Sequence, residues 1–536
     1  MPSSSAGERA DGTVSQPESF PLGRLGGSWR GRMLNAGLAL AGVVAIIVAI
    51  WQLITPAAEL VVTDTRVGTT PVRVYQLPGG EPAPAVVIAH GFAGSRQLME
   101  PFAITLARNG YLAVTFDFLG HGRNPAPMRG DITKETGATR ALMAELGEVV
   151  AFARGLDGSD GQVALLGHSM ACDILVRYAQ SDPGVAATVA VSMLSPAVTP
   201  ESPKNLLVIV GGWEAGLKTE ALRVVGMVAE GEPVEGRLYG AFEDGSARQT
   251  TFAAGVEHIG VLYSPDSLHA ALGWLNQVFD RPGDGPVVVR GPWLLLLFGG
   301  LIVLARPLSE LLPTVAERPV GPEIPPRRLL GIALLPVVLT PLLLWPLEVR
   351  FLPVLVADYL ALHFAVYGLL TALGLWWAGR NGGGGPLGHA SLASLGLGAA
   401  LVTLYGLLGP GLALDRFFTS FMPIPERWPV VLAILAGTLP YFLADESLTR
   451  SPGAPHGFYP LTKLGFLVSL ALAIALNLER LFFLIIIVPL ILVFFIVFGL
   501  FSRWAFRRTG HPWVGGLANA VVFAWAIGST FPLVEG

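Results

Sequence analysis

The sequence has few charged residues and almost no cysteine. Asp, Glu, Lys and Arg make up 14% of its 536 residues, whereas a soluble globular protein carries about 25%. Much of the chain is therefore expected to lie in lipid, and a mean hydropathy of +0.58 agrees with this. The net charge of −4 gives no support for nucleic-acid binding. The single cysteine, Cys172, excludes an intramolecular disulfide, and we interpret it as a packing residue on a buried helix face.

Patterns that bind metals and nucleotides are also missing. No cluster of His, Cys, Asp and Glu has metal-ligand spacing, and no P-loop or dinucleotide glycine pattern occurs. The glycine run Gly382–Gly385 has neither a strand nor a Gly-Lys-Ser/Thr sequence beside it, so it predicts a flexible cytoplasmic loop. We therefore expect neither a cofactor nor a metal.

A strand-turn-helix pattern surrounds Ser169. The apolar run Val163–Leu166 predicts a short buried strand, Gly167–Ala171 reads Gly-His-Ser-Met-Ala, and Ile174–Val176 begins a helical pattern. Small residues at both ends of the motif let a sharp turn close and hold the serine hydroxyl out from the sheet edge. The segment predicts a nucleophile elbow with Ser169 as the nucleophile.

Two further motifs lie upstream, each directly after a predicted strand. His90-Gly91-Phe92 follows the strand Ala85–Ala89, and Gly120–Gly122 (Gly-His-Gly) follows the strand Gly110–Asp117. In order and spacing, these motifs and the serine motif resemble those of the α/β-hydrolase superfamily. The resemblance covers about residues 58–280. It implies an α/β fold with a doubly wound sheet, and serine hydrolase activity.

A serine is a poor nucleophile unless a base takes its proton. The base should be a histidine late in the domain, on a loop after the last strand. His258 fits, because it follows the strand-like Thr250–Ala254 and precedes the helical stretch Ser267–Phe279. His269 lies within that helical stretch and is the weaker candidate.

The triad also needs an acid that orients the imidazole and stabilises its charged form. Glu214 is the first carboxylate beyond the apolar strand Leu206–Val210, and it keeps the chain order Ser, acid, His. The superfamily more often has Asp here, so Glu243 and Asp244 remain rivals, although Phe242–Ser246 predicts a hairpin turn. The residues interpreted as structural, or as pointing away from the base, are Asp117, Glu257, His90 and His121.

The resemblance also implies an oxyanion hole, and the short connection between two predicted strands suggests a hypothesis about substrate access. The two backbone N–H donors would belong to Phe92 and Met170. Many relatives insert a cap before the acid-bearing strand, but here only about ten residues connect Leu194 to Leu206. Without a cap domain, the site should be open or covered by the membrane domain. This favours a lipid-like substrate, or one delivered at the bilayer surface.

Long apolar runs account for the rest of the chain. Residues 1–32 are polar and are expected to form a disordered cytoplasmic tail, and residues 33–56 contain an uncleaved transmembrane anchor. We assign residues 57–286 to the hydrolase domain and residues 287–536 to an all-α membrane domain of about eight helices. The spans predicted after the anchor are 291–305, 329–347, 351–378, 391–414, 428–444, 464–478, 481–501 and 513–533.

Charges in the connections predict the orientation of these spans. Arginines precede the anchor, and alternate connections are basic while the intervening ones are balanced. This pattern predicts a cytoplasmic N-terminus and an extracytoplasmic hydrolase domain, in a plasma membrane of bacterial type. The basic connections carry Arg306, Arg318, Arg327, Arg328, Arg380, Arg450, Lys463, Arg503, Arg507 and Arg508.

Two ionisable residues, Asp358 and His363, fall inside the predicted span 351–378. Charge within a membrane span is a candidate for a functional role. Their spacing of five residues places them on different helix faces, so we do not expect them to pair. If the helix starts later, Asp358 lies near the outer interface and needs no special role.

The sequence thus predicts a membrane-anchored serine hydrolase that acts on an ester or related acyl substrate. Acyl transfer and peptide hydrolysis use the same triad, so an acyltransferase and a peptidase remain alternatives. Its expected partners are a small-molecule or lipid acyl substrate and the membrane lipid itself, with no nucleic acid. The alternative is a transporter or membrane-assembly protein whose hydrolase-like domain only binds a ligand. The intact Ser169 and His258 pair favours the enzyme, and the lack of an evident inverted repeat among the spans weakens transport.

Overall fold

The structure is a computed structural model. It describes residues 28–130, 135–282, 285–321, 323–379, 390–450 and 453–535. Most of the expected N-terminal tail lies outside these ranges, as do Arg380 and the glycine run Gly382–Gly385.

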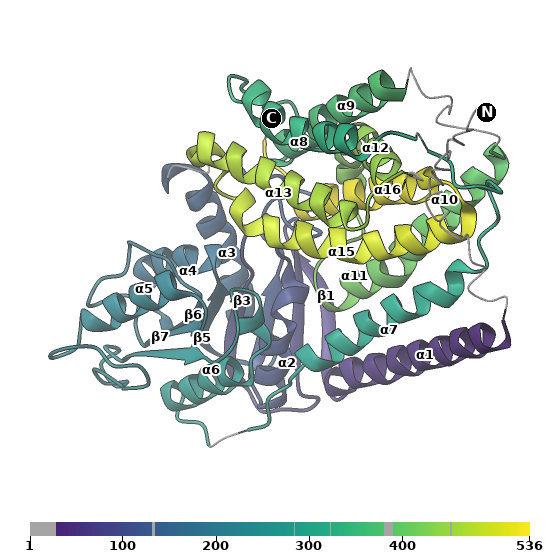
Figure 1. Cartoon of the computed structure of the whole chain (residues 1–536). Helices are drawn as coiled ribbons and strands as arrows, with labels where there is room; N and C mark the ends of the chain where they lie inside the picture. The colour runs from purple at the N-terminus through teal and green to yellow at the C-terminus, as the bar shows by residue number, and fades with distance from the viewer. Residues whose placement is uncertain are drawn as a thin grey trace, which may run out of the picture.

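An eight-stranded sheet lies at the centre of the α/β part (Figure 1). The strands follow the order β1-β2-β4-β3-β5-β6-β7-β8. The contacts of β2 with β1 and β4 are antiparallel, and all the other strand pairs are parallel. The strands are β1 (Val61–Val67), β2 (Thr70–Gln76), β3 (Ala83–Ala89), β4 (Leu112–Phe116), β5 (Ser159–His168), β6 (Val185–Val191), β7 (Leu206–Gly211) and β8 (Arg248–Ala253).

Helices cover both faces of this sheet, and the strand residues alternate between the two cores. Val86 and Ile88 of β3 pack on the face covered by α2 (Glu100–Arg108) and α6 (Pro265–Val278). Their neighbour Val87 packs on the opposite face, which is covered by α3 (Arg140–Arg154), α4 (Met170–Ser181) and α5 (Ala215–Gly226). Strands buried on both faces read as continuous apolar runs, as β3, β4 and β7 do. The predicted doubly wound α/β sheet is confirmed.

The connection between β6 and β7 is short. Residues 192–205, all of which the structure describes, contain no helix. A separate cap domain has no place in this connection, as the sequence predicts.

Long apolar helices make up the rest of the described chain (Figure 1). Within the described ranges, nine helical segments are long and apolar enough to cross a bilayer, which indicates an integral membrane protein. They are α1 (Trp29–Ala58), α7 (Gly291–Ser309), α8 (Pro326–Leu344), α9 (Ala357–Gly379), α10 (Leu392–Gly406) with α11 (Leu412–Phe417), α12 (Trp428–Arg450), α13 (Phe458–Leu476), α15 (Leu484–Thr509) and α16 (Pro512–Thr530).

One predicted span begins later than expected. Residues 351–356 are not helical, because Pro353 disfavours a helix and Val354 instead forms a β-bridge with Leu533. Asp358 therefore lies in the first turn of α9, where its carboxylate accepts hydrogen bonds from the backbone N–H groups of Phe351 and Tyr359. This position fits the interpretation that gives Asp358 no special role.

Two polar residues of the membrane region have partners on other helices. His363 lies 3.1 Å from Ser469 Oγ through its Nε2 and does not pair with Asp358. Lys463 was expected in a connection, but α13 begins six residues before the predicted 464 and includes it. Its ammonium group is buried and pairs with Asp445 of α12. Burial of this lysine inside the bundle is possible because the opposite charge is beside it.

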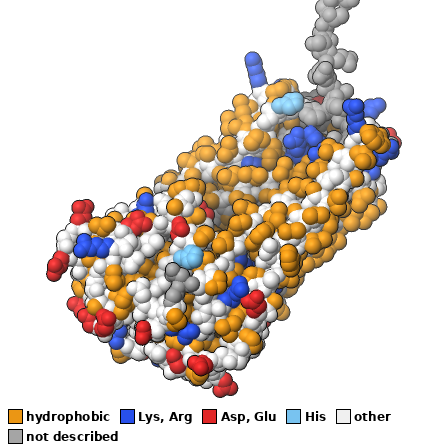
Figure 2. All heavy atoms as spheres, turned by 90° about the horizontal axis from the view of Figure 1, so that it is seen from below, with side chains coloured by type: hydrophobic (Ala, Val, Ile, Leu, Met, Phe, Trp, Pro, Cys, Tyr) orange, Lys and Arg blue, Asp and Glu red, His pale blue; other side chains and the backbone are white. Residues whose placement is uncertain are grey.

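Arginines hydrogen-bond to backbone carbonyl groups at both ends of the helical bundle. At the end far from the sheet, Arg508 of α15 donates to the Glu310 carbonyl just beyond α7. At the other end, Arg427 donates to the Phe531 carbonyl beyond α16 and to the Gly120 carbonyl of the α/β part. Figure 2 shows hydrophobic side chains along the helical region, Lys and Arg gathered at its far end, and most of the visible Asp and Glu over the α/β part.

Candidate active site

Ser169 lies in a sharp turn between β5 and α4. Its φ of 54° and ψ of −117° are sparsely populated for a residue with a side chain and cost roughly 1–3 kcal/mol. The inside of the turn is tightly packed, since a Cβ at Gly167 would lie 2.5 Å from Leu175 Cδ1. The Ser169 N–H donates to the Val191 carbonyl at 2.9 Å and ties the turn to β6. The local geometry is that of a nucleophile elbow.

The fold brings Ser169, His258 and Glu214 together from three separate loops. His258 Nε2 lies 2.9 Å from Ser169 Oγ, and His258 Nδ1 lies 2.5 Å from Glu214 Oε1. An ionised carboxylate only accepts, so the Nδ1–H donates to Glu214 and leaves Nε2 as the acceptor for the serine hydroxyl. This tautomer is the one that a general base requires.

Glu214 is held by three donors. Its Oε2 accepts hydrogen bonds from Ser192 Oγ at 2.6 Å and from the Gly211 N–H at 2.7 Å, while Oε1 faces His258. Burial by itself raises the pKa of Glu214, but the hydrogen bonds from His258, Ser192 and Gly211 outweigh it and hold the pKa below its ordinary value. The carboxylate therefore stays ionised beside the imidazole. The sequence gives no signal for Ser192, because the contact depends on strand order.

His168 holds the backbone of the candidate base His258 in place. Burial, with a smaller contribution from neighbouring His258, lowers the pKa of His168 to about 3, so its imidazole is neutral at pH 7. Its Nε2 lies 2.9 Å from the His258 carbonyl oxygen. A carbonyl only accepts, so the Nε2–H donates and fixes the backbone at His258. The sequence by itself indicates no role for His168, although this residue stands within the serine motif.

Two backbone donors lie beside the serine. A Cβ at Gly91 would lie 3.1 Å from Ser169 Cβ, so the chain leading into Phe92 passes directly beside the nucleophile. Met170 is the first residue of α4, where helix N–H groups have no partner within the helix. Among the described residues, neither the Phe92 nor the Met170 N–H donates to a protein acceptor. Both remain available to an oxyanion.

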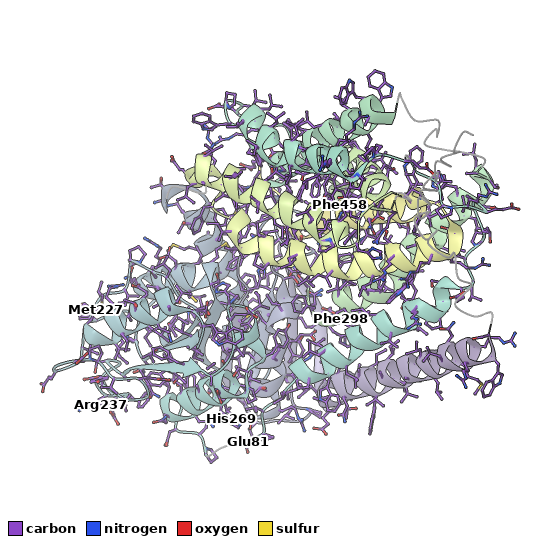
Figure 3. All side chains as sticks on the ribbon, viewed as in Figure 1. Glu81, Met227, Arg237, His269, Phe298 and Phe458 are labelled. Carbon is purple, nitrogen blue, oxygen red and sulfur yellow. The ribbon has the colours of Figure 1, made fainter. Side chains whose placement is uncertain are left out.

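The rival histidines lie apart from this arrangement. His269 is exposed on the outer side of α6 (Figure 3). His90 is buried, accepts from the Phe118 N–H through Nε2, and lies 2.8 Å from the Gly91 carbonyl through Nδ1. His121 is likewise buried, with Nδ1 2.9 Å from the Leu119 carbonyl. The last two are held by backbone groups.

The rival carboxylates also have other partners. Asp244 and Glu243 are exposed, and Asp244 accepts from the Ser246 N–H within its own turn. Asp117 accepts from two backbone N–H groups, which fixes the loops after β3 and β4. Glu257 accepts from the N–H groups of the two residues that follow His258 and so points away from the imidazole. The described residues contain no group of three or more His, Cys, Asp or Glu placed to hold a metal ion.

The helical region packs against the same edge of the sheet that carries the triad. The ring of Phe92 stacks on Phe483, which directly precedes α15, with centroids 4.3 Å apart. Ser95 Oγ accepts from the Ser420 N–H at 2.9 Å. Arg123, after β4, forms a 2.5 Å ion pair with Asp415 of α11. These contacts put the helices beside the loops after β3 and β4, while the loops after β6 and β7 stay uncovered.

The last residues of the chain add to this contact. The Met128 N–H donates to the Leu533 carbonyl and the Leu533 N–H donates to the Gly120 carbonyl, both at 2.8 Å. Arg427 is fully buried and donates to the same Gly120 carbonyl at 2.7 Å. The helical region thus bonds to the backbone of the loop after β4. No sequence motif predicts this contact.

Comparison with protein families gives one match to the α/β part. The family profile described as "Serine aminopeptidase, S33" matches residues 80–237. That range includes Ser169 and Glu214 and ends before His258. A comparison with curated proteins gives no match.

Solved structures with a similar fold cover the α/β part. A dienelactone hydrolase from Anabaena variabilis is 15% identical, covers 41% of this chain and 97% of its own, with a TM-score of 0.30. An epoxide hydrolase from Vigna radiata is 23% identical over 27% of this chain and 42% of its own, with a TM-score of 0.21. A bacterial membrane phospholipase A is 14% identical and covers 46% of this chain and 96% of its own, with a TM-score of 0.31.

Proposed function

Because this chain carries an α/β-hydrolase domain joined to long apolar helices, we propose that it is a membrane-anchored serine hydrolase of ester or related acyl substrates. The observation that carries the proposal is the chain of contacts from Glu214 to His258 and from His258 to Ser169, at 2.5 and 2.9 Å. Such a hydrogen-bonded triad activates a serine hydroxyl, which is otherwise a weak nucleophile.

The chemistry follows from the position of each group. His258 Nε2 takes the hydroxyl proton as Ser169 Oγ attacks the acyl carbon, and the charge on the imidazole is stabilised by Glu214. The carbonyl oxygen becomes negative and accepts hydrogen bonds from the Phe92 and Met170 N–H groups. His258 then returns the proton to the leaving group. Water, activated by the same base, releases the acyl group and restores Ser169.

The surroundings of the triad favour a substrate with an apolar chain. The ring of Phe92, beside the nucleophile, stacks on the ring of Phe483 in the membrane region. On the uncovered side, Trp213 precedes Glu214 and is 70% exposed, and Leu194 in the loop after β6 is 64% exposed. Large exposed apolar side chains around a reactive group are typical of sites that accept lipids. We therefore infer that the acyl chain enters from the bilayer surface.

The distribution of charge supports an extracytoplasmic α/β domain. The basic end of the helical bundle lies far from the sheet, and basic ends of membrane spans face the cytoplasm. The cell membrane of a bacterial-type cell is the proposed location.

Labelling with a fluorophosphonate tests the proposal. The full-length protein in detergent should label, and Ser169→Ala should abolish labelling and lower ester hydrolysis by several orders of magnitude, because triad members act as a unit. His258→Ala should show a loss of similar size. Ser181→Ala, at the exposed end of α4, is the matched control and should label normally. If Ser169→Ala labels at the wild-type rate, the assignment is wrong; a folded wild type that never labels would favour the binding-domain alternative.

A further inference from the structure

A cavity of about 480 Å³ lies at the sheet-proximal end of the α1 span. One wall is apolar and comes from the last turns of α1, including Leu53, Ile54 and Ala58. The other wall carries Arg73 of β2, Glu100 at the start of α2, and Arg290 at the start of α7. The cavity therefore joins the side of a membrane span to a charged surface of the α/β domain.

The charged wall contains more arginines than carboxylates. Glu100 accepts from Arg290 at 2.6 Å and from Arg73 at 3.2 Å, and Arg416 of α11 lies 3.5 Å away. Asp64 of β1 pairs with Arg73 at 2.8 Å and with Arg96 at 2.9 Å. Four guanidinium groups thus share two carboxylates, which leaves an excess of two positive charges in this paired group.

Part of this excess charge is buried and not fully paired. Arg290 is 2% exposed, and among the described residues its Nε has no hydrogen-bond partner. A buried donor without an acceptor destabilises the fold unless a ligand satisfies it. The Arg416 side chain, which also lines the cavity, is 52% exposed and can reach a ligand. The Arg290 and Arg416 guanidinium groups therefore favour an anionic ligand in this cavity.

The neighbouring helices indicate what kind of anion fits. α1 ends at Ala58 and α7 begins at Gly291, and these two spans lie side by side (Figure 1). The cavity therefore lies where both spans leave the bilayer, at the level of lipid head groups. We infer that it binds the phosphate of an anionic phospholipid, with the guanidinium groups of Arg290 and Arg416 on the phosphate and an acyl chain along Leu53 and Ile54.

Size and chemistry agree with this ligand. Guanidinium groups bind phosphate oxygens in a fixed two-point geometry, and cationic groups at the membrane surface attract anionic lipids. Pockets of a few hundred Å³ commonly hold small ligands, so 480 Å³ accommodates a glycerophosphate head group. A free phosphate ion would make no use of the apolar wall. None of the triad residues lines this cavity.

Lipid retention measured by native mass spectrometry tests the site. Full-length protein is reconstituted in nanodiscs of mixed phosphatidylglycerol and phosphatidylcholine, and the lipids that stay bound after release into detergent are counted. Wild type should retain phosphatidylglycerol preferentially. Arg416→Gln should weaken this retention about tenfold, as expected for one charge-assisted hydrogen bond. Ala58→Trp should weaken it without any change of charge, because Ala58 is exposed and lines the cavity.

Arg66→Gln is the matched control, because Arg66 is exposed on β1 and does not line the cavity. It should retain phosphatidylglycerol as wild type does, and gel filtration checks that each variant is folded. Equal retention in all folded variants, or no preference for phosphatidylglycerol in wild type, overturns the inference. Displacement of the lipid by millimolar glycerol 3-phosphate would instead identify a site for soluble phosphate esters and overturn the lipid assignment. Fluorophosphonate labelling reports on Ser169 separately.

Discussion

At the scale of single residues, the proposed chemistry depends on how Glu214 is fixed. Its two oxygens face different groups, with Oε1 toward His258 and Oε2 toward Ser192 and the Gly211 N–H. The Oε2 contacts leave Oε1 no freedom to rotate away from the imidazole.

Replacement of this carboxylate tests its role. Glu214→Gln should lower kcat by roughly four orders of magnitude, the loss typical when the orienting acid of a serine triad becomes an amide. Asp244→Asn, in the exposed turn, should keep near wild-type kcat. The measurement is hydrolysis of a chromogenic ester by purified full-length variants. The reverse result, with Asp244→Asn inactive and Glu214→Gln normal, would move the acid to the turn.

A second buried carboxylate should make stability depend on pH. Burial raises the pKa of Glu145 to about 7 from an ordinary 4.5, although Thr70, the Leu119 N–H and Asn124 donate to it. Between these values the folded state holds a proton that the unfolded state has lost, so stability falls as pH rises from about 4.5 to about 7. The full effect is at most ~3 kcal/mol.

Thermal unfolding at pH 5 and pH 8 measures this effect. The unfolding midpoint of wild type should fall between the two values, and Glu145→Gln should reduce that fall. Glu148→Gln, on the exposed side of the same helix, is the control and should behave as wild type does. An unchanged pH dependence in Glu145→Gln would show that another group is responsible.

At the scale of elements, α1 is held to the rest of the membrane region through α7. Two glycines let these helices approach closely, since a Cβ on Gly300 would lie 3.0 Å from the Gly42 carbonyl oxygen, and the converse holds for Gly42. Small residues at such contacts are typical of helix pairs in membranes, where packing rather than hydrophobic burial drives association.

Gly300→Leu should force α1 and α7 apart. The leucine has no free space at this point, and overpacking of this kind costs about 1–3 kcal/mol. Gly299→Leu is the matched control, because Gly299 is exposed on α7 and a Cβ there would meet nothing within 4 Å. Thermal unfolding in detergent should give a lower midpoint for Gly300→Leu only. A similar fall for Gly299→Leu would show that the loss comes from helix conformation rather than packing.

At the scale of the whole molecule, the membrane region packs beside the candidate triad, against one side of the sheet edge that carries it. It contacts the loops after β3 and β4 through Phe483, Asp415 and Arg427. Because these contacts include hydrogen bonds to backbone groups, the α/β domain has a fixed orientation on the helices. This packing of the spans beside the candidate triad is our reason for proposing a substrate drawn from the membrane surface.

Accessibility to an impermeant maleimide tests the orientation in cells. In a Cys172→Ala background, Glu243→Cys should react in intact cells, because this exposed residue belongs to the α/β domain. Glu317→Cys, exposed beyond the far end of α7, should react only after permeabilisation. Reaction at 317 but not at 243 in intact cells would place the α/β domain in the cytoplasm. That result would leave access of substrate from the bilayer surface possible but would exclude the extracytoplasmic location.

The sequence determined those features that are encoded by neighbours along the chain. The Gly-His-Ser-Met turn indicates Ser169 as the candidate nucleophile, and the apolar runs indicate the strands and the predicted spans. Chain order indicates His258 as the candidate base and Glu214 as the candidate acid. These patterns are local because side-chain periodicity and turn chemistry act over a few residues. Errors arose where tertiary contacts override the local pattern, as at residues 351–356, which pair with the chain end, and at Lys463, which Asp445 neutralises inside the bundle.

Only the tertiary structure decided what surrounds the site. Gly120 and Arg427 are 307 residues apart in the chain, yet their hydrogen bond helps to fix the membrane region on the catalytic edge. The support of Glu214 by Ser192, the stacking of Phe92 on Phe483, and the arginines gathered around Glu100 also join separate elements. The physical reason is that such contacts depend on strand order and helix packing, which no single segment specifies.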